Sequence, residues 1–205
     1  MTARVHAQQW SVTVVGDGDD PRMPAVREAI QHWNRQLAAL GTSVRFGPVV
    51  ESAKADVDDD AFALVSSGGI GEYGTDHALS LADYDTDVVV FLTGGNFPSV
   101  GLPHRENQHG VVILRRTTDE PLSLPNVARN VAAHELGHVL GLIHNQDPRS
   151  LMCGRPSPCR PDMYASETPR FFPLTAEEKN YLKQRFGNAP RGPRLAGRTR
   201  KRVVP

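Results

Sequence analysis

Three of the eight histidines in this sequence lie within eleven residues, in the segment HELGHVLGLIH that runs from His134 to His144. In a helix, His134 and His138 are about one turn apart and project both imidazoles to the same side, where they can bind one metal ion. Glu135 then lies about 100° around the helix, beside such an ion but not bound to it. The residue types and their spacing therefore predict a metal site with a carboxylate next to it.

Gly141 and His144 extend the pattern. A glycine permits a sharp turn after the helix, and this turn would bring His144 back as a third ligand. Three imidazole nitrogens leave a four-coordinate ion one open position for water, the arrangement of catalytic rather than structural zinc. Two histidines four residues apart can also be an ordinary surface pair, but five specified positions in eleven favour the metal site. Zn²⁺ is the expected ion, although cobalt or nickel would also bind.

Two helices that could position these residues are predicted from apolar side chains that recur every three or four positions. The first begins at Pro24 and ends at Gly41. The second carries the histidines, has Ser123 as its N-cap and Pro125 in its first turn, and ends at Gly141. The residues that define the two faces are Val26, Ile30, Trp33, Leu37 and Leu40 in the first helix, and Val127, Val131, His134 and His138 in the second.

Four strands are predicted around these helices. Residues 10–15 (WSVTVV) alternate apolar with polar side chains, and SVRFGPVV forms a second strand. Residues 87–93 and 110–116 are continuous apolar, β-branched runs, typical of strands that are buried on both faces. Residues 51–86 give no clear pattern. The order of strand, helix and strand predicts a mostly parallel sheet with helices packed against it.

The composition is that of a globular domain. Hydrophobic residues make up 39% of the 205 positions, and no apolar run reaches the roughly 18 residues that a membrane span requires. The length allows one domain with a substantial core. The N-terminal segment MTARVHAQQW lacks the apolar core of a signal peptide, so we expect the chain to start at the mature domain.

Charge is distributed unevenly along the chain. Residues 187–205 contain six Lys or Arg and no acid, whereas the rest has 17 basic and 23 acidic residues, a net charge of −6. We interpret residues 188–205 as a disordered, solvated tail, with a polyanion-binding arm as the alternative. The acidic clusters at residues 16–20 and 56–60 lack the regular spacing of a calcium loop, so Ca²⁺ binding is unsupported.

The segment VAAHELGHVLGLIH resembles the active-site helix of the matrixins, the matrix-metalloproteinase-like branch of the metzincin zinc peptidases. Met152 lies eight residues after His144, at the place of the Met-turn in that family. LTAEEKNYLKQRFG, residues 174–187, resembles the C-terminal helix of matrixin catalytic domains, with Glu177 and Glu178 where the family has two aspartates. The similarity covers residues 8–187, and only the histidine motif is highly specific.

This resemblance implies an α+β metzincin fold with an α/β-like upper subdomain over residues 8–141 and a lower subdomain over residues 142–187. The upper part would hold a twisted, mostly parallel five-stranded sheet with an antiparallel edge strand, and two long helices. The lower part would hold the Met-turn and the terminal helix. The edge strand is expected between Ser99 and His104, where Val100, Gly101 and Leu102 would pair with an extended substrate.

The implied activity is that of a zinc-dependent endopeptidase with a protein or peptide substrate. Zinc would lower the pKa of a bound water toward about 7, and Glu135 would act as the general base. Residues 153–172 would wall the pocket for the residue after the cut, with Met163, Tyr164, Phe171 or Phe172 as its lining. We expect a monomer without a membrane span or specific nucleic-acid partner. No propeptide cysteine switch is found, so latency would depend on an upstream segment, on a proteinaceous inhibitor, or on neither.

The sequence departs from the family pattern at several positions. Asn145 follows the third histidine where matrixins usually have serine, so the clan is better supported than the branch. Gly154, two residues after Met152, replaces the extra tyrosine ligand of astacin-like and serralysin-like enzymes. The remaining histidines do not reproduce the structural zinc and calcium sites of vertebrate matrixins, and we interpret three of them as surface residues: His77, His104 and His109.

Cys153 and Cys159 follow the Met-turn methionine in CGRPSPC. A disulfide between them would brace this segment and would place the protein in an oxidising, extracytoplasmic compartment, as a secreted protein. A reduced pair in a cytosolic enzyme and a secondary metal site are the alternatives.

Two further functions compete with that of a peptidase. The fold could be a zinc-bound, non-catalytic binding module, but such a module has no need for the base Glu135. Alternatively, the chain could act mainly through its basic tail as a polyanion-binding protein, and its binding would then depend on salt.

Overall fold

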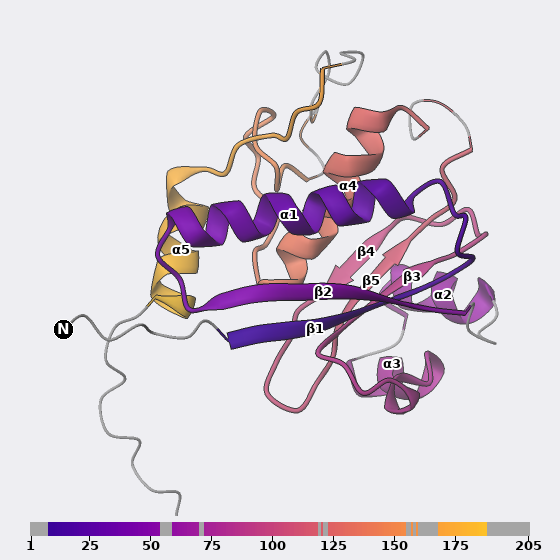
Figure 1. The fold of residues 1–205 in the computed structure, drawn as a ribbon. Coiled ribbons are helices and arrows are strands. Elements are labelled where there is room, and N and C mark those ends of the chain that lie inside the picture. Colours follow the sequence, from indigo (N-terminus) through magenta and orange to yellow (C-terminus); the bar gives the residue numbers. More distant parts are fainter. Residues whose placement is uncertain are drawn as a thin grey trace, which may run out of the picture.

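Five strands form one sheet in the order β2-β1-β3-β5-β4 (Figure 1). The structure is a computed structural model, and it describes residues 8–53, 59–69, 72–118, 120, 123–154, 157, 159 and 168–187. The pairs β1–β2, β1–β3 and β3–β5 are parallel, and β4 runs antiparallel to β5 at one edge. The strands are β1 (Gln8–Val15), β2 (Val44–Ser52), β3 (Val88–Leu92), β4 (Val100–Leu102) and β5 (Gly110–Leu114).

Helices cover both faces of this sheet (Figure 1). The two long helices pack on each other on one face, and the short helices lie against the other. The sequence predicted both long helices, whereas the short helices fall in the region that gave no clear pattern. The elements are α1 (Met23–Ala39), α2 (Asp59–Ser66), α3 (Glu72–Ala78), the 3₁₀ turn η1 (Leu81–Asp83), α4 (Pro125–Val139) and α5 (Ala176–Phe186).

Alternate residues of β3 and β5 point into two separate cores. Val88, Val90 and Val112 join the main core with α1, α4 and α5, whereas Val89 and Val111 face α2 and η1. Every residue of β3 and β5 is buried. This arrangement confirms that the two continuous apolar runs are strands covered on both faces, and it confirms the α+β fold with an antiparallel edge strand.

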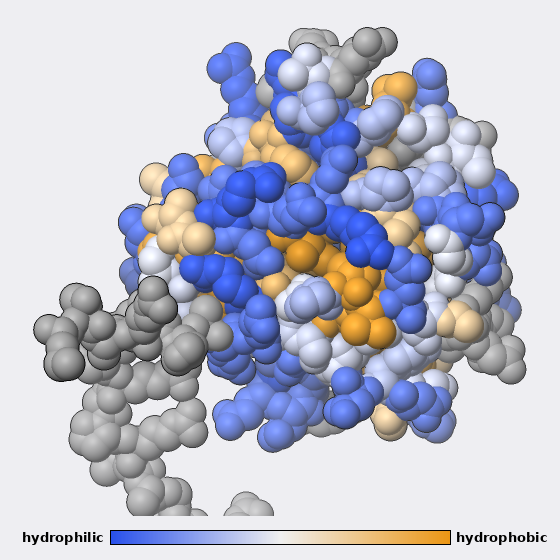
Figure 2. Space-filling view, viewed as in Figure 1, coloured by the Kyte–Doolittle hydropathy of each residue, from blue (hydrophilic) through white to orange (hydrophobic). Residues whose placement is uncertain are grey.

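The surface over α1 and β2 is mostly hydrophilic, and hydrophobic side chains gather in one patch near its centre (Figure 2). The exposed side of α1 carries its polar residues, as expected for a helix with one apolar stripe. No helix among the described residues is both long and apolar enough to cross a bilayer.

The ends of α1 and α4 follow local sequence rules, with one correction. Gly41 and Gly141 adopt φ values of +68° and +87° just beyond the two helices, as their C-terminal positions predicted. Ser123 was predicted to be the N-cap of α4, but the structure places Leu124 there, with φ −65° and ψ 131°. The reason is steric, because the residue before Pro125 is pushed into an extended conformation and must be the last residue outside the helix.

The start of the described chain and its last helix meet at the start of β2. Gln8 N donates a hydrogen bond to Ser43 O at 2.6 Å, and Ser43 N donates to Phe186 O at 2.7 Å. Thr42 and Gly187 form a further antiparallel bridge. The end of α5 is therefore bonded to the segment just before β2, at one edge of the sheet. The first turn of α5 is fixed by a capping box between Thr175 and Glu178.

Candidate metal centre

The Nε2 atoms of His134, His138 and His144 converge on one point. They lie 3.0 Å apart for His134 and His144, 3.2 Å for His134 and His138, and 3.1 Å for His138 and His144. Among the described residues, this is the only group of three or more histidines, cysteines or acids close enough to share an ion. Glu135 lies next to the group and is not a member of it. The structure thus brings together the three residues that the spacing predicted as ligands.

Hydrogen bonds on the far side of two rings define their protonation. His134 Nδ1 lies 2.8 Å from Leu151 O, and His138 Nδ1 lies 2.7 Å from Leu142 O. Because a carbonyl only accepts, each Nδ1 must carry the hydrogen, and each neutral ring then turns the lone pair of Nε2 toward the centre. Burial lowers the pKa of His138 below its usual value, which favours the neutral form that binds metals.

The donor set fits a tetrahedral ion. Nitrogen ligands at 2.0 to 2.1 Å from a tetrahedral zinc ion lie about 3.3 to 3.4 Å from one another, close to the 3.0 to 3.2 Å found between the three Nε2 atoms. Lone pairs that face one another at this distance repel unless a cation lies between them. The site therefore matches zinc in donor type, number and spacing.

Gly141 makes the turn that returns His144 to α4. Its N–H donates to His138 O at 2.8 Å, and Leu142 N donates to Gly137 O at 3.0 Å. With a φ of +87°, residue 141 is in the left-handed region, and a Cβ there would lie 2.6 Å from the Tyr181 hydroxyl. The left-handed backbone at residue 141 therefore favours glycine, and a side chain there would also meet the ends of Tyr181 and Arg185.

Met152 lies fully buried beneath the histidine helix. A Cβ on Gly137 would lie 2.4 Å from Met152 Sδ and 3.2 Å from the Trp33 ring. The Trp33 indole also donates a hydrogen bond to Ala133 O at 2.8 Å. The glycine inside HELGH therefore lets α4 pack directly on Met152 and on α1. This packing fixes the position of the helix that carries His134 and His138.

The edge strand β4 is pressed against α4 beside Glu135. A Cβ on Gly101 would lie 2.2 Å from Glu135 O and 2.8 Å from His138 Cβ. Glu135 is 7% exposed. The strand predicted to pair with substrate, Val100 to Leu102, therefore lies against Glu135, the predicted base, and against His138, one of the predicted ligands.

Two asparagines that the sequence analysis missed hold the C-terminal segment to α4. Asn126 donates to Thr168 O at 3.0 Å and accepts from Arg170 N at 3.1 Å. Asn130 donates to Arg170 O and accepts from Phe172 N, both at 2.9 Å. The signal was present, because asparagines 126 and 130 continue the four-residue spacing of the histidines at 134 and 138 on a helix that is otherwise mostly buried.

Cys153 and Cys159 form a disulfide, so the described chain has no free cysteine. Of the three arrangements that the sequence left open, the structure therefore contains the bridged one. Cys153 is 2% exposed and directly follows Met152, and the loop closed by the bridge begins at the candidate metal centre.

Two aromatic residues predicted to line a substrate pocket pack elsewhere. Phe172 is buried in the main core, and Phe171 stacks on His32 of α1 with ring centroids 4.1 Å apart. Asn130 holds the Phe172 backbone against α4, which turns both rings toward the helix layer. Met163 and Tyr164 lie outside the described residues.

The other histidines and the first acidic cluster have separate partners. His77 is exposed, His104 stacks on Trp10, and His109 Nε2 lies 3.1 Å from Tyr84 O. Burial lowers the pKa of His104. In the first acidic cluster, Asp20 forms an ion pair with Arg22. Residues 56–58 of the second cluster lie outside the described part.

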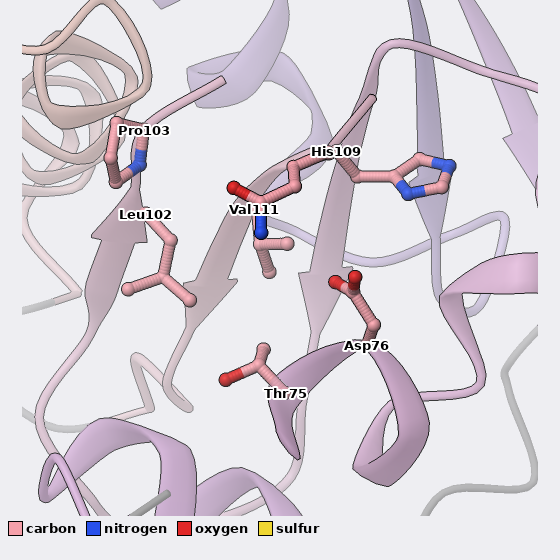
Figure 3. A pocket seen from close by; sticks show the side chains of 7 residues that line it. Thr75, Asp76, Leu102, Pro103, His109 and Val111 are labelled. Atoms are coloured by element: carbon pink, nitrogen blue, oxygen red, sulfur yellow. The ribbon is translucent and has the colours of Figure 1, made fainter. Parts of the chain in front are cut away.

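A small cavity beside the end of β4 is too narrow for a substrate side chain. Leu102 and Pro103 line it together with Thr75 and Asp76 of α3 (Figure 3). Its volume is about 20 Å³, room for roughly one water molecule. Substrate contacts at β4 would therefore involve the open edge of the strand rather than this cavity.

Comparisons with known proteins agree with the site and with the fold. Residues 98–165 match the matrixin family of peptidases, and this range contains β4, α4 and the Met152 turn. Human matrix metalloproteinase-27 is 38% identical over 63 residues, which are 31% of this chain. The match spans only 11% of the length of that curated relative.

A solved structure is similar in fold over most of the chain. The crystal structure of an archaemetzincin from Methanopyrus kandleri superposes with a TM-score of 0.54 and covers 90% of this chain and 97% of its own. The two sequences are 19% identical, so this likeness concerns the fold. The chain is therefore similar to the archaemetzincin in its fold, and the third of the chain that carries the histidine motif is similar to the matrixins.

Proposed function

We propose that this protein is a zinc-dependent endopeptidase. The observation that carries the proposal is the convergence of three Nε2 atoms at 3.0 to 3.2 Å, two of them turned inward by hydrogen bonds to carbonyl groups. In this proposal, His134, His138 and His144 hold the ion. When bound, zinc would lower the pKa of a water molecule and polarise a substrate carbonyl.

Glu135 acts as the general base. Its carboxylate belongs to the same helical turn as two of the ligands and stays outside the ligand group. It accepts a proton from the attacking water and passes this proton to the leaving amine. Its low exposure reduces screening by solvent, which strengthens its interaction with charge that develops beside it.

The substrate pairs with β4 as an additional antiparallel strand. Among the described residues β4 is an edge strand that pairs with β5 alone, so in this part of the chain the other side of its backbone is open to an added strand. Main-chain pairing orients an extended peptide with little dependence on its sequence. Because Gly101 contacts α4 at Glu135 and His138, a peptide on β4 would run close to the base and the metal.

The disulfide favours work in an oxidising compartment. We therefore propose export and a peptide or protein substrate outside the cytosol. In such a compartment the bridge between Cys153 and Cys159 stays oxidised, so the loop after Met152 stays closed.

The test is a Glu135→Gln variant. The change keeps the shape of the side chain and removes the proton acceptor, so zinc should stay bound while hydrolysis of a quenched fluorescent peptide falls by about 10² to 10⁴. Zinc content is measured by elemental analysis. Glu106→Gln, an exposed change in the β4–β5 connection, is the matched control and should keep the wild-type rate.

Two results would overturn the proposal. A fully zinc-loaded Glu135→Gln protein with the wild-type rate would show that Glu135 is not the general base. If the wild-type protein binds zinc but cleaves no member of a mixed peptide library, the chain is a zinc-bound binding module instead.

A further inference from the structure

His144 is the exposed member of the three histidines, whereas His134 is buried and His138 is half-buried. The two helical ligands are held by α4 and by bonds from their Nδ1 atoms. The His144 ring packs closely against the main chain of Gly154. A Cβ at residue 154 would lie 2.3 Å from His144 Cγ and 2.6 Å from His144 Nδ1. Gly154 is thus one of the contacts that set the position of the third ligand.

Gly154 is tied to the segment that carries His144. Asn145 N donates to Met152 O at 2.9 Å, and Gly154 N donates to Asn145 O at 3.0 Å. These bonds form a short parallel bridge between Asn145 and Cys153. Asn145, the residue after the third histidine, is therefore joined through both its N–H and its C=O to residues 152–154, the segment that supports the His144 ring.

The Asn145 side chain fixes the same junction. Its Oδ1 accepts from Asp147 N and from Ser150 Oγ, both at 2.8 Å. Its Nδ2 donates to Glu178 Oε1 in the first turn of α5. A serine side chain is too short to join three segments in this way, which gives a structural reason for asparagine at this departure from the matrixin pattern.

The disulfide closes the loop that contains Gly154. Cys153 precedes Gly154, and its partner Cys159 closes the loop five residues further on. Ser157, inside the loop, donates from its N–H to Gly154 O at 3.2 Å and from its hydroxyl to Gln146 O at 3.1 Å. Ser157 therefore joins Gly154, the support of His144, to Gln146.

We propose that the Cys153–Cys159 loop positions the third metal ligand through Gly154, so that the redox state of this disulfide controls how tightly the protein holds its ion. The inference rests on the metal site of the proposed function and adds regulation to it. With the bridge closed, His144 is pre-positioned. With the bridge open, Gly154 loses a restraint, and the protein must order His144 each time it binds an ion.

The chemical step is an ordinary disulfide reduction. A small dithiol attacks one sulfur, the Sγ–Sγ bond breaks, and the two cysteines leave as thiols while the dithiol becomes a cyclic disulfide. A phosphine gives the same two thiols and is converted to its oxide with water as the oxygen source. Either reductant changes the covalent state of the loop without altering the three histidines.

The test measures zinc affinity by competition with a chromophoric chelator. Wild-type apoprotein is compared before and after treatment with a phosphine, which is then removed by anaerobic gel filtration. Loss of a group that orients a ligand typically lowers metal affinity by about 10- to 100-fold, so the Kd for Zn²⁺ should rise at least tenfold on reduction. A Cys153→Ala/Cys159→Ala variant should match the reduced protein and should not respond to the phosphine.

A second variant tests the same contact with the disulfide intact. Gly154→Ala places a methyl group against the His144 ring and should weaken zinc binding by a similar factor. Gly94→Ala is the matched control, because a Cβ at residue 94 has no atom within 4 Å. Histidine ring NMR of the apoproteins supplies a local measurement, in which the signals of His144 should shift while the Nδ1–H signals of His134 and His138 persist.

The outcomes separate this inference from the proposed function. Equal zinc affinity in the oxidised and reduced proteins would overturn it, as would wild-type affinity in Gly154→Ala. A higher affinity after reduction would also overturn it, because the thiols would then act as ligands themselves. If the wild-type protein did not bind zinc at all, the proposed function of a zinc-dependent endopeptidase would be wrong instead. Far-UV circular dichroism verifies that each variant is folded at the temperature of the titration.

Discussion

The contact between Gly101 and α4 leads to a quantitative prediction. In Gly101→Ala the new Cβ would lie 2.2 Å from Glu135 O, whereas ordinary contacts begin near 3.4 Å. Strand β4 must therefore move away from α4 by about 1 Å. A misplacement of this size can cost about 10²-fold in rate, and overpacking a tight contact typically costs about 1 to 3 kcal/mol of stability.

The assay compares kcat/KM for an extended quenched peptide, together with zinc content and the free energy of unfolding in urea. We expect kcat/KM to fall about 10²-fold, with the metal retained because no ligand is removed. Gly94→Ala serves again as the control for a glycine-to-alanine change in open space. If Gly101→Ala kept both the wild-type stability and the wild-type kcat/KM, the reasoning from the β4–α4 contact would be refuted.

Three other predictions concern the ligand set, the asparagine pair and pH. His144→Ala should lower zinc affinity strongly, and a dialysed variant that still held one zinc per chain by elemental analysis would exclude His144 as a ligand. Asn130→Ala leaves Arg170 O and Phe172 N without their partner, so urea unfolding should show a loss of roughly 2 to 4 kcal/mol, and a loss below experimental error would contradict the role of this side chain. Burial and, secondarily, the charge of Arg35 lower the pKa of His32 to about 4 in the folded protein. Between about pH 6.5 and 4 the unfolded chain therefore binds a proton at His32 that the folded protein does not bind. The free energy of unfolding should accordingly fall as the pH drops through this window, by up to about 3 kcal/mol, and should be unaffected by His32 above it. His32→Phe should remove this part of the pH dependence in urea unfolding measured from pH 7 to 4, and an unchanged profile would contradict the assignment.

The parts of the fold that were predictable are those governed by local rules. The continuous apolar runs of β3 and β5 indicated strands covered on both faces, because only such strands can bury every side chain. The three histidines were predictable as a group because helix geometry and one glycine bring them together. These signals depend on residues that are close in sequence.

The features that were missed depend on partners far away along the chain. Asn126 and Asn130 bind backbone atoms about forty residues away, so their four-residue spacing places them on the histidine face of α4 but does not identify these partners. Phe171 and Phe172 were predicted to face a pocket, but Phe172 N donates to Asn130 Oδ1 on α4, Phe171 stacks on His32 of α1, and Phe172 lies in the core. Ser123 was chosen as N-cap for its side chain, whereas the conformational restriction imposed by Pro125 decided the position.

Ser43 joins the first described strand to the last helix, since Gln8 and Phe186 both hydrogen-bond to its main chain. Residues 8 and 187 are therefore spatial neighbours although nearly the whole domain separates them in sequence. A linker of a few residues could join them without crossing the fold, and new termini could then be opened in an exposed connection. The same geometry would let the domain be inserted into a loop of another protein as a cassette, with both junctions on one small area of its surface.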